Sequence, residues 1–220
     1  MDRRRAIKNL DFTRYVIMKG GEEKYGNKFL FNDSIIVRFI SLFVIGAILF
    51  VAVWHLSYHF LPEGIMRGKT GSAIIVGSDA ASTMFEEWST IVMWNLGALF
   101  LIVLINFIRY LDRFPLGYIT PLGMIALYAV FLGTNSFSIP MAEPLAPTLA
   151  VLGRGGPYEM TAYLLVAVAT YNQSRFALTN DSYHISPVPR LSLEQWVGIG
   201  LAIALILLAG WHEAAMIVAL

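Results

Sequence analysis

The sequence contains no cysteine and few charged residues. Without cysteine the chain can have no disulfide framework, no thiol nucleophile and no thiolate-bound metal. Asp, Glu, Lys and Arg together make up 14% of the 220 residues, whereas a soluble domain has about 25%. The formal net charge is +1, and the basic residues lie beside apolar segments rather than forming a stripe, which argues against a nucleic-acid partner.

Sequence motifs of several enzyme classes are also missing. There is no GxxxxGK[ST] phosphate loop, no HExxH pair, no GxSxG elbow and no GxGxxG fingerprint. Energy coupling through a nucleotide would therefore need a separate subunit. The basic start of the chain is followed by mixed polar residues rather than a short apolar core, so we expect no signal peptide.

What the sequence has instead is an excess of apolar residues. Hydrophobic residues make up 57% of the chain, and the mean hydropathy is +0.63. A helix needs about 20 apolar residues to cross a bilayer, and five stretches meet or approach this length: 35–61, 88–108, 116–134, 157–172 and 195–220. The sequence therefore predicts an all-α membrane protein, with five transmembrane helices in a domain of residues 35–220 and a cytoplasmic N-terminal arm of residues 1–34.

Three connecting segments carry further expectations. Residues 135–156 are apolar but contain three prolines and three glycines, which are incompatible with a continuous helix. Irregular backbone at membrane depth must be covered by protein or a wet cavity, so we expect a re-entrant or outer-surface segment between the third and fourth helices. The apolar middle of the loop 62–87 is expected on the membrane surface. Apolar clusters in the N-terminal arm suggest an interfacial helix.

Lys and Arg predict the orientation of the chain in the cell membrane. With a cytoplasmic N-terminus, thirteen of the sixteen basic residues fall in cytoplasmic segments, and only Arg67, Lys69 and Arg154 fall outside. An odd number of spans then places the C-terminus outside the cell.

Histidines and acids in or beside the spans gather toward the outer boundary. His55 and His59 are four residues apart, so they share a helix face and could reach one metal ion. Glu159, His212 or Glu213 could supply a further ligand, although nothing in the sequence shows that these residues meet. Aromatic neighbours explain the two histidines without a ligand. We therefore predict no metal and no cofactor.

Glu159 is the acid that we expect to matter most. It follows Gly155, Gly156 and Pro157, so it falls in the first turn of a helix, where the helix dipole favours a carboxylate. It can cap free amide groups there, or it can pair with a cation on a partner or on Arg154. We favour the pairing, because Ser, Thr or Asn would serve equally well as a cap.

Two asparagines and a set of small residues predict helix packing. Asn95 and Asn106 are eleven residues apart and lie on nearly the same helix face. Amide side chains in hydrocarbon usually hydrogen-bond across helices. Small residues four positions apart in the last span predict close helix contact in the same way. They are Gly198, Ala202, Gly210 and Ala214.

Three short elements mark the stretch from the second to the fourth span. They are Trp94-Asn95, Leu132-Gly133-Thr134-Asn135 and Gly156-Pro157-Tyr158-Glu159, the last opening a helix rich in small residues. In these elements the stretch resembles the stage II sporulation protein M family of small integral membrane proteins. In place of the third element, members of the family typically have a His-Gly-x-x-Glu-like element. Glu159 matches its acid, while Arg154, Gly155 and Gly156 stand where the histidine is expected.

The resemblance implies a five-span membrane subunit of a larger assembly, with Glu159 as its signature acid. Asn95 and Asn135 lie in the similar elements and are further functional candidates. The leading prediction is thus a non-enzymatic integral membrane subunit that acts as a scaffold or assembly component with other membrane subunits or further copies of itself. Two alternatives stay open: a transporter or permease component with a site near residues 135–156, and an outer-leaflet metal or haem enzyme.

Overall fold

The computed structural model of the chain describes residues 29–69, 83–110, 114–137, 143–173, 176–178, 183–185 and 188–219. The interfacial helix expected in the N-terminal arm and the apolar middle of the loop 62–87 lie outside these residues.

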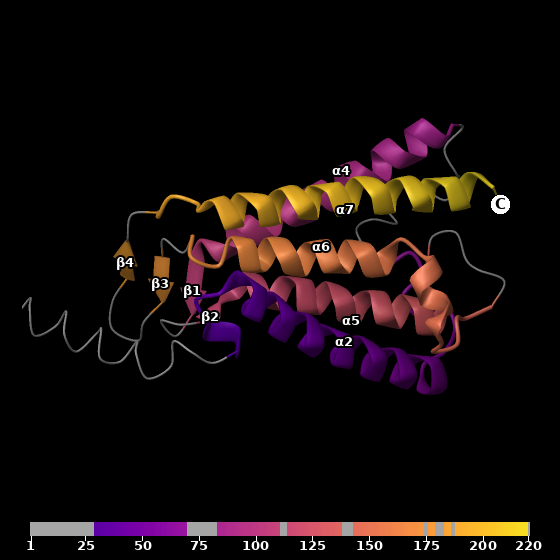
Figure 1. The fold of residues 1–220 in the computed structure, drawn as a ribbon. Helices are drawn as coiled ribbons and strands as arrows, with labels where there is room; N and C mark the ends of the chain where they lie inside the picture. Colours follow the sequence, from indigo (N-terminus) through magenta and orange to yellow (C-terminus); the bar gives the residue numbers. More distant parts are fainter. Residues whose placement is uncertain are drawn as a thin grey trace, which may run out of the picture.

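Five α-helices lie side by side in one bundle (Figure 1). They are α2 (Ile35–Phe60), α4 (Met84–Asn106), α5 (Ile119–Thr134), α6 (Gly156–Ala169) and α7 (Leu193–Val218). Four segments are long and apolar enough to cross a membrane: Ile35–Phe60, Met84–Asn106, Leu116–Thr134 and Leu193–Val218. The third of these combines α5 with the 3-10 turn η2 (Leu116–Tyr118). The chain is therefore a multi-pass helical membrane protein in contact with the lipid bilayer.

The helix α6 is shorter than the span predicted at its position. Its 14 residues extend over about 21 Å, whereas the hydrocarbon core of a bilayer is about 30 Å thick. Thr170 ends the helix, whereas the predicted span extends to residue 172. The structure thus has the five predicted helices, but only four of them have the length of a full span.

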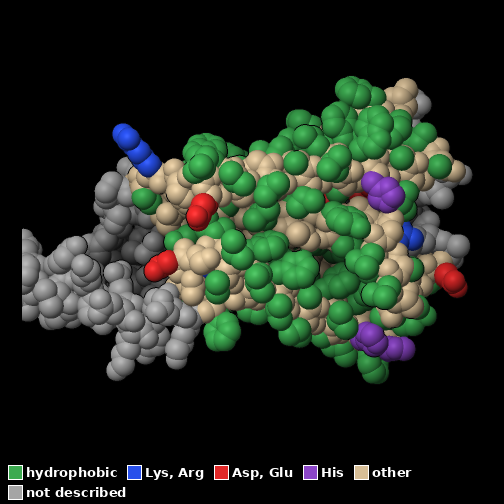
Figure 2. Space-filling model, in the orientation of Figure 1, with side chains coloured by type: hydrophobic (Ala, Val, Ile, Leu, Met, Phe, Trp, Pro, Cys, Tyr) green, Lys and Arg blue, Asp and Glu red, His purple; other side chains and the backbone are tan. Residues whose placement is uncertain are grey.

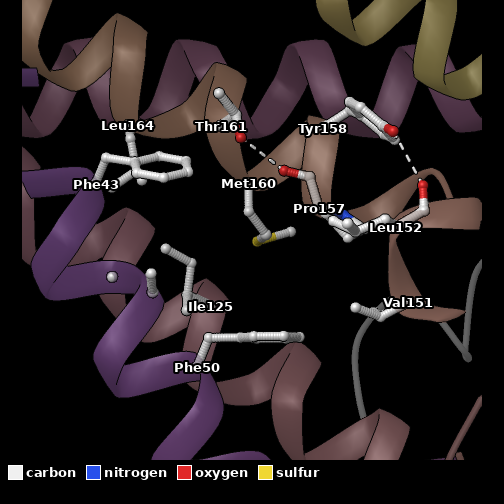
Figure 3. A pocket seen from close by; sticks show the side chains of 12 residues that line it. Phe43, Phe50, Ile125, Val151, Leu152, Pro157, Tyr158, Met160, Thr161 and Leu164 are labelled. Atoms are coloured by element: carbon white, nitrogen blue, oxygen red, sulfur yellow. Dashed lines mark hydrogen bonds between the residues drawn. The ribbon is translucent and has the colours of Figure 1, made fainter. Parts of the chain in front are cut away.

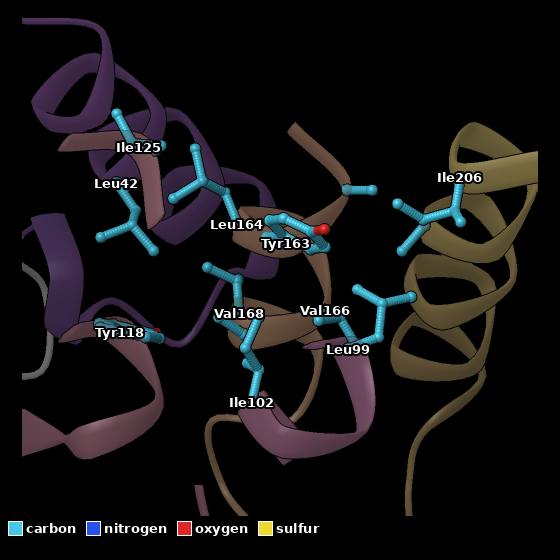
Figure 4. Close-up of a cluster of buried hydrophobic side chains, with 13 residues drawn as sticks. Leu42, Leu99, Ile102, Tyr118, Ile125, Tyr163, Leu164, Val166, Val168 and Ile206 are labelled. Atoms are coloured by element: carbon cyan, nitrogen blue, oxygen red, sulfur yellow. The ribbon is translucent and has the colours of Figure 1, made fainter. Parts of the chain in front are cut away.

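The core of the bundle is built around α6. Nine of its 14 residues are buried, and Figure 1 shows it between α5 and α7. Apolar side chains from every other helix pack against it (Figure 4). These include Leu42 of α2, Leu99 and Ile102 of α4, Ile125 of α5 and Ile206 of α7. A short helix therefore occupies the position with the least access to lipid.

A small four-stranded sheet lies at one end of the bundle, which we call the sheet end. Its strands are β1 (Ile108–Tyr110), β2 (Phe114–Pro115), β3 (Phe176–Leu178) and β4 (Tyr183–Ile185), in the order β2-β1-β3-β4. The strands β1 and β3 pair in parallel, and the other two pairs are antiparallel. The all-helical prediction did not include this sheet, because strands of two or three residues are too short to show a period-2 pattern.

The opposite end of the bundle carries the 3-10 turn η3 (Leu149–Gly153), and we call it the η3 end. Residues 135–137 and 143–155 contain no α-helix. Trp54 donates a hydrogen bond from its indole Nε1 to the carbonyl of Leu145 at 2.8 Å. The amide of Leu145 in turn donates to the carbonyl of Leu132 at 3.1 Å. The described part of the segment 135–156 is therefore packed against α2 and α5.

The surface side chains change from charged to hydrophobic and back to charged along the axis of the bundle. Figure 2 shows hydrophobic side chains over the middle of one face, with Asp, Glu, Lys, Arg and His toward the two ends. The large exposed apolar side chains include Ile48 of α2, Phe100 of α4 and Leu208 of α7. This distribution matches a body whose middle is surrounded by lipid and whose ends contact water.

Gly133 marks the closest approach of α5 to α2, which leads to a stability prediction. A Cβ at Gly133 would lie 2.3 Å from the Ser57 hydroxyl oxygen and 2.8 Å from the backbone nitrogen of Tyr58. Because backbone cannot move aside cheaply, we expect Gly133→Ala to destabilise the bundle by about 1–3 kcal/mol. Unfolding by SDS in mixed micelles measures this effect.

Gly123 of the same helix is the matched control. A Cβ there meets nothing within 4 Å, and alanine favours helix over glycine by about 1 kcal/mol. Gly123→Ala should therefore be neutral or stabilising. Equal behaviour of the two variants would contradict the close α2–α5 contact.

Candidate functional site

Glu159 lies at the centre of a buried polar cluster between α4, α6 and α7. The Asn95 side chain donates a hydrogen bond from Nδ2 to Oε1 of Glu159 at 2.7 Å. Tyr163 donates its hydroxyl hydrogen bond to Oδ1 of the same asparagine. The carboxyl groups of Glu159 and Glu213 also hydrogen-bond to each other. We call these four residues the Glu159 cluster.

The position of Asn95 follows from the helical period of α4. The buried residues of that helix include Val92, Asn95, Leu99, Ile102 and Asn106, spaced alternately three and four positions apart. This spacing forms one stripe along an α-helix. The two asparagines therefore point into the bundle, where their amide groups need partners.

The glycine pair before α6 makes room for the acids and aromatics around it. A Cβ on Gly155 would lie 3.1 Å from Oε2 of Glu213, and a Cβ on Gly156 would overlap the ring of Tyr128. Neither glycine has a left-handed backbone conformation. The glycines are thus required by close approach, and they let α7 and α5 contact the first turn of α6.

Of the two pairings predicted for Glu159, the one with Arg154 is not the contact that the structure has. Its hydrogen-bond partners are the neutral amide of Asn95 and the carboxyl of Glu213, not the guanidinium of Arg154. In the part of the chain that the structure describes, the ion pair within 4.0 Å joins Arg67 to Glu63, at 3.9 Å. A hydrogen bond between two carboxyl groups requires a proton on one of them, because an ionised carboxylate only accepts. Glu159 is therefore held by side chains of its own chain.

The carboxyl end of α6 is the second polar site. The last four carbonyl groups of an α-helix lack partners within the helix, and each unpaired group in lipid costs several kcal/mol. In α6 these carbonyls belong to residues 166–169. Two of them accept from the backbone that follows: Val166 from the amide of Thr170 at 3.0 Å, and Val168 from the amide of Tyr171 at 3.3 Å.

Side chains from the two neighbouring helices supply the remaining bonds. Asn106 of α4 donates to the carbonyl of Ala167 at 2.8 Å and to the Thr170 hydroxyl at 2.7 Å. Gln195 of α7 donates to the carbonyl of Ala169 at 2.8 Å. We call Asn106 and Gln195 the α6 cap. Together they satisfy the carboxyl end of α6, which lies level with the last residue of α4 and the first turn of α7.

Gln195 was not singled out by the sequence analysis. Its side-chain Oε1 accepts a hydrogen bond from the backbone amide of Ser192, and its backbone amide donates to the Ser192 hydroxyl. These two bonds form a capping box at the start of α7. The Ser-x-x-Gln pattern before an apolar run could have indicated that role. No sequence pattern indicates that the same side chain also reaches α6.

Small residues of α7 lie where the helices approach each other. A Cβ on Gly198 would lie 3.1 Å from the Cβ of Ala169 in α6, and a Cβ on Gly210 would lie 3.2 Å from Val92 in α4. Ala202 and Ala214 are fully buried. The four predicted packing residues of α7 thus face the other helices.

Asn135 belongs to a different site at the η3 end. It ends α5 with a φ of 49°, a left-handed conformation that asparagine tolerates. Its Nδ2 donates to Glu63 at 2.9 Å, and its carbonyl accepts from Arg67 at 2.7 Å. Asn135 therefore fastens the segment that follows α2, and it shares no partner with Glu159.

Among the described residues, the structure does not bring the candidate metal ligands into one group. The rings of His55 and His59 lie 6.0 Å apart on α2. His212 instead contacts the carbonyl of Gly153 at 2.8 Å, and Glu213 belongs to the Glu159 cluster. Within the described residues no three metal-ligating side chains come together. The metal or haem enzyme hypothesis therefore gains no support from this part of the chain.

An apolar cavity of about 320 Å³ lies beside the first two turns of α6 (Figure 3). Residues of α2, α5, η3 and α6 line it. The contribution of α2 comes from Phe43, Gly46, Ala47 and Phe50, which share one helix face.

No family model, curated protein or solved structure matches the chain. Its resemblance to the stage II sporulation protein M family therefore rests on the residues quoted for it above.

The Glu159 cluster predicts different effects for two substitutions. Glu159→Gln keeps an oxygen to accept from Asn95 and gains an amide that can donate to Glu213, so its free energy of unfolding should stay close to that of the wild type. Glu159→Ala leaves the buried Asn95 amide without that acceptor and should cost about 1–3 kcal/mol. Unfolding by SDS in mixed micelles compares the two.

Glu143→Ala serves as a control, because Glu143 lies exposed outside the helices. It should have little effect on stability. A glutamine variant as unstable as the alanine variant would show that the carboxyl group is needed for more than these hydrogen bonds.

Proposed function

We propose that the chain is a non-enzymatic integral membrane subunit that acts as a rigid scaffold within a larger membrane complex. The observation that carries the proposal is the α6 cap. Asn106 and Gln195 bind the end of one central helix from two sides, so movement of α4 or α7 relative to α6 would expose buried polar groups. Helices fastened to one another in this way favour the function of a scaffold subunit over that of a transporter, whose helices must move during alternating access.

The buried polar side chains of the Glu159 cluster also hydrogen-bond to one another. Asn95 hydrogen-bonds to both Glu159 and Tyr163. All but one of the α6 residues from Ala162 to Ala169 are buried. Side chains that fasten helices together are typical of packing in membranes. The resemblance to a family of membrane scaffold subunits supports the same function.

The proposed topology has five passes, with the N-terminus in the cytoplasm and the C-terminus outside. It is supported by the direction of α6, which begins after η3 and ends before β3, so it returns the chain from the η3 end to the sheet end (Figure 1). The distribution of Lys and Arg favours a cytoplasmic sheet end. In this topology the segment 135–156 covers the outer end of α6.

A transporter or permease component is the second candidate. The observation in its favour is the bond between Glu159 and Glu213 at the start of a helix that follows non-helical backbone. Interrupted helices whose ends face a ligand are how many transporter sites are built. The scaffold is preferred because the cluster contains its own hydrogen-bond partners.

Photo-crosslinking in intact membranes tests the scaffold proposal. A photoreactive amino acid is placed on three outward faces, at Ile48 of α2, Phe100 of α4 and Leu208 of α7, which are 63–69% exposed. A scaffold subunit should form a discrete protein adduct from at least one of these faces, and mass spectrometry of the adduct identifies the second subunit.

Ile206, fully buried in α7, is the matched control and should crosslink only within the chain. Lipid adducts alone from all three outward positions would contradict a stable protein assembly. In that case the transporter candidate becomes the better one.

A further inference from the structure

The cavity beside α6 borders α2 at Ala47, a small and exposed residue. A Cβ on Gly46 would lie 3.0 Å from Ile125, so that position is already closely packed. Ala47 lies between Phe43 and Phe50 on the face of α2 that lines the cavity. Opposite them stand Pro157 and Thr161 of α6. The sticks in Figure 3 surround an open space between the two helices.

The lining offers nothing to a polar ligand. The Thr161 hydroxyl donates to the carbonyl of Pro157 at 2.8 Å, and the Tyr158 hydroxyl donates to the carbonyl of Leu152 at 3.0 Å. Both bonds are drawn in Figure 3. All other lining side chains are apolar. Since a buried water needs two to four polar partners, the occupant must be hydrocarbon.

The size of the cavity limits that occupant. A dry apolar cavity of about 150 Å³ already binds benzene, and binding sites for small molecules begin near 300 Å³. At about 320 Å³ the space suits one slender chain and is too small for a whole lipid. Left empty, the lining would lose the dispersion contacts that close packing provides.

The mouth of the cavity is continuous with the lipid-facing surface. The rim residues Phe43, Leu152 and Tyr158 are 42%, 53% and 44% exposed. Phe43 belongs to α2, one of the four segments that can span the membrane, and its neighbours Ile40 and Val44 are exposed as well. Acyl chains are therefore the molecules that surround this opening.

We propose that the cavity between α2, α6 and η3 is a specific binding site for one acyl chain of a bilayer phospholipid. The inference goes beyond the scaffold function and depends only on the membrane position of the chain. The Tyr158 bond to Leu152 fixes η3 over α6 and so keeps the site shaped before the chain enters. A bound acyl chain would then fill the space beside Ala47.

Photolabelling of the purified full chain tests the proposal. The protein is reconstituted in phosphatidylcholine and phosphatidylglycerol vesicles that contain a phosphatidylcholine with a diazirine on one acyl chain. After illumination, mass spectrometry should find residues 157–164 labelled well above residues 201–208 of α7, whose outward side chains report ordinary contact with lipid.

Two matched variants separate the cavity from the surface. Ala47→Phe fills the cavity and should lower labelling of residues 157–164 by about tenfold, because loss of two buried methylene groups weakens binding by about that factor. Ala52→Phe adds the same ring to an exposed position of α2 outside the cavity and should leave labelling unchanged. SDS unfolding midpoints near the wild-type value verify that both variants fold.

Three outcomes overturn the inference. Equal labelling of 157–164 and 201–208 means that only the surrounding lipid is seen, and insensitivity to Ala47→Phe means that the label reports another surface. A protein adduct from a photoreactive residue at position 47 in native membranes means that a partner helix occupies the cavity. The vesicle experiment uses purified protein, so its result is independent of the crosslinks that test the scaffold function.

Discussion

The four carbonyl groups at the end of α6 are the constraint on which the arrangement of the bundle depends. They belong to a helix of 14 residues that is too short to end in water on both sides of a bilayer. Ala167 and Ala169 are fully buried, and buried backbone carbonyls need hydrogen-bond partners. Asn106 and Gln195 meet that need at Ala167 and Ala169, and by doing so they fix the positions of α4 and α7 relative to the central helix.

The other end of α6 is fixed by different chemistry. There the glycines at positions 155 and 156 let Glu213 and Tyr128 approach the first turn, and Asn95 reaches Glu159 from α4. The central helix is thus bound at both ends by side chains of α4 and α7, while α2 packs on its remaining side and leaves the apolar cavity. Hydrogen bonds therefore fasten α6 on the side of α4 and α7, and the cavity borders it on the side of α2.

Much of this could be predicted from the sequence, and what could not has physical reasons. Long apolar runs located the helices, because a bilayer imposes their length. The length of α6 was overestimated, because no glycine or proline marks its end and the C-cap Thr170 gives no strong stop signal. Asn95 and Glu159 were both candidates, but side chains 64 positions apart give no sign that they bond. Glu159 therefore bonds to Asn95 rather than to Arg154, its expected partner. Gln195 was missed because its hydrogen bond to Ala169 of α6 depends on tertiary packing alone.

The central claim is that α6, despite its length, carries the chain back across the membrane as a fifth pass. Reporters fused to the two ends of the full chain test it most directly, because alkaline phosphatase is active only outside the cytoplasm and green fluorescent protein reports the opposite side. If α6 crosses, the two ends lie on opposite sides of the membrane, with the C-terminal reporter outside. Reporters on the same side would mean that only the four long segments cross, and the account of α6 as a capped, membrane-crossing helix would be wrong.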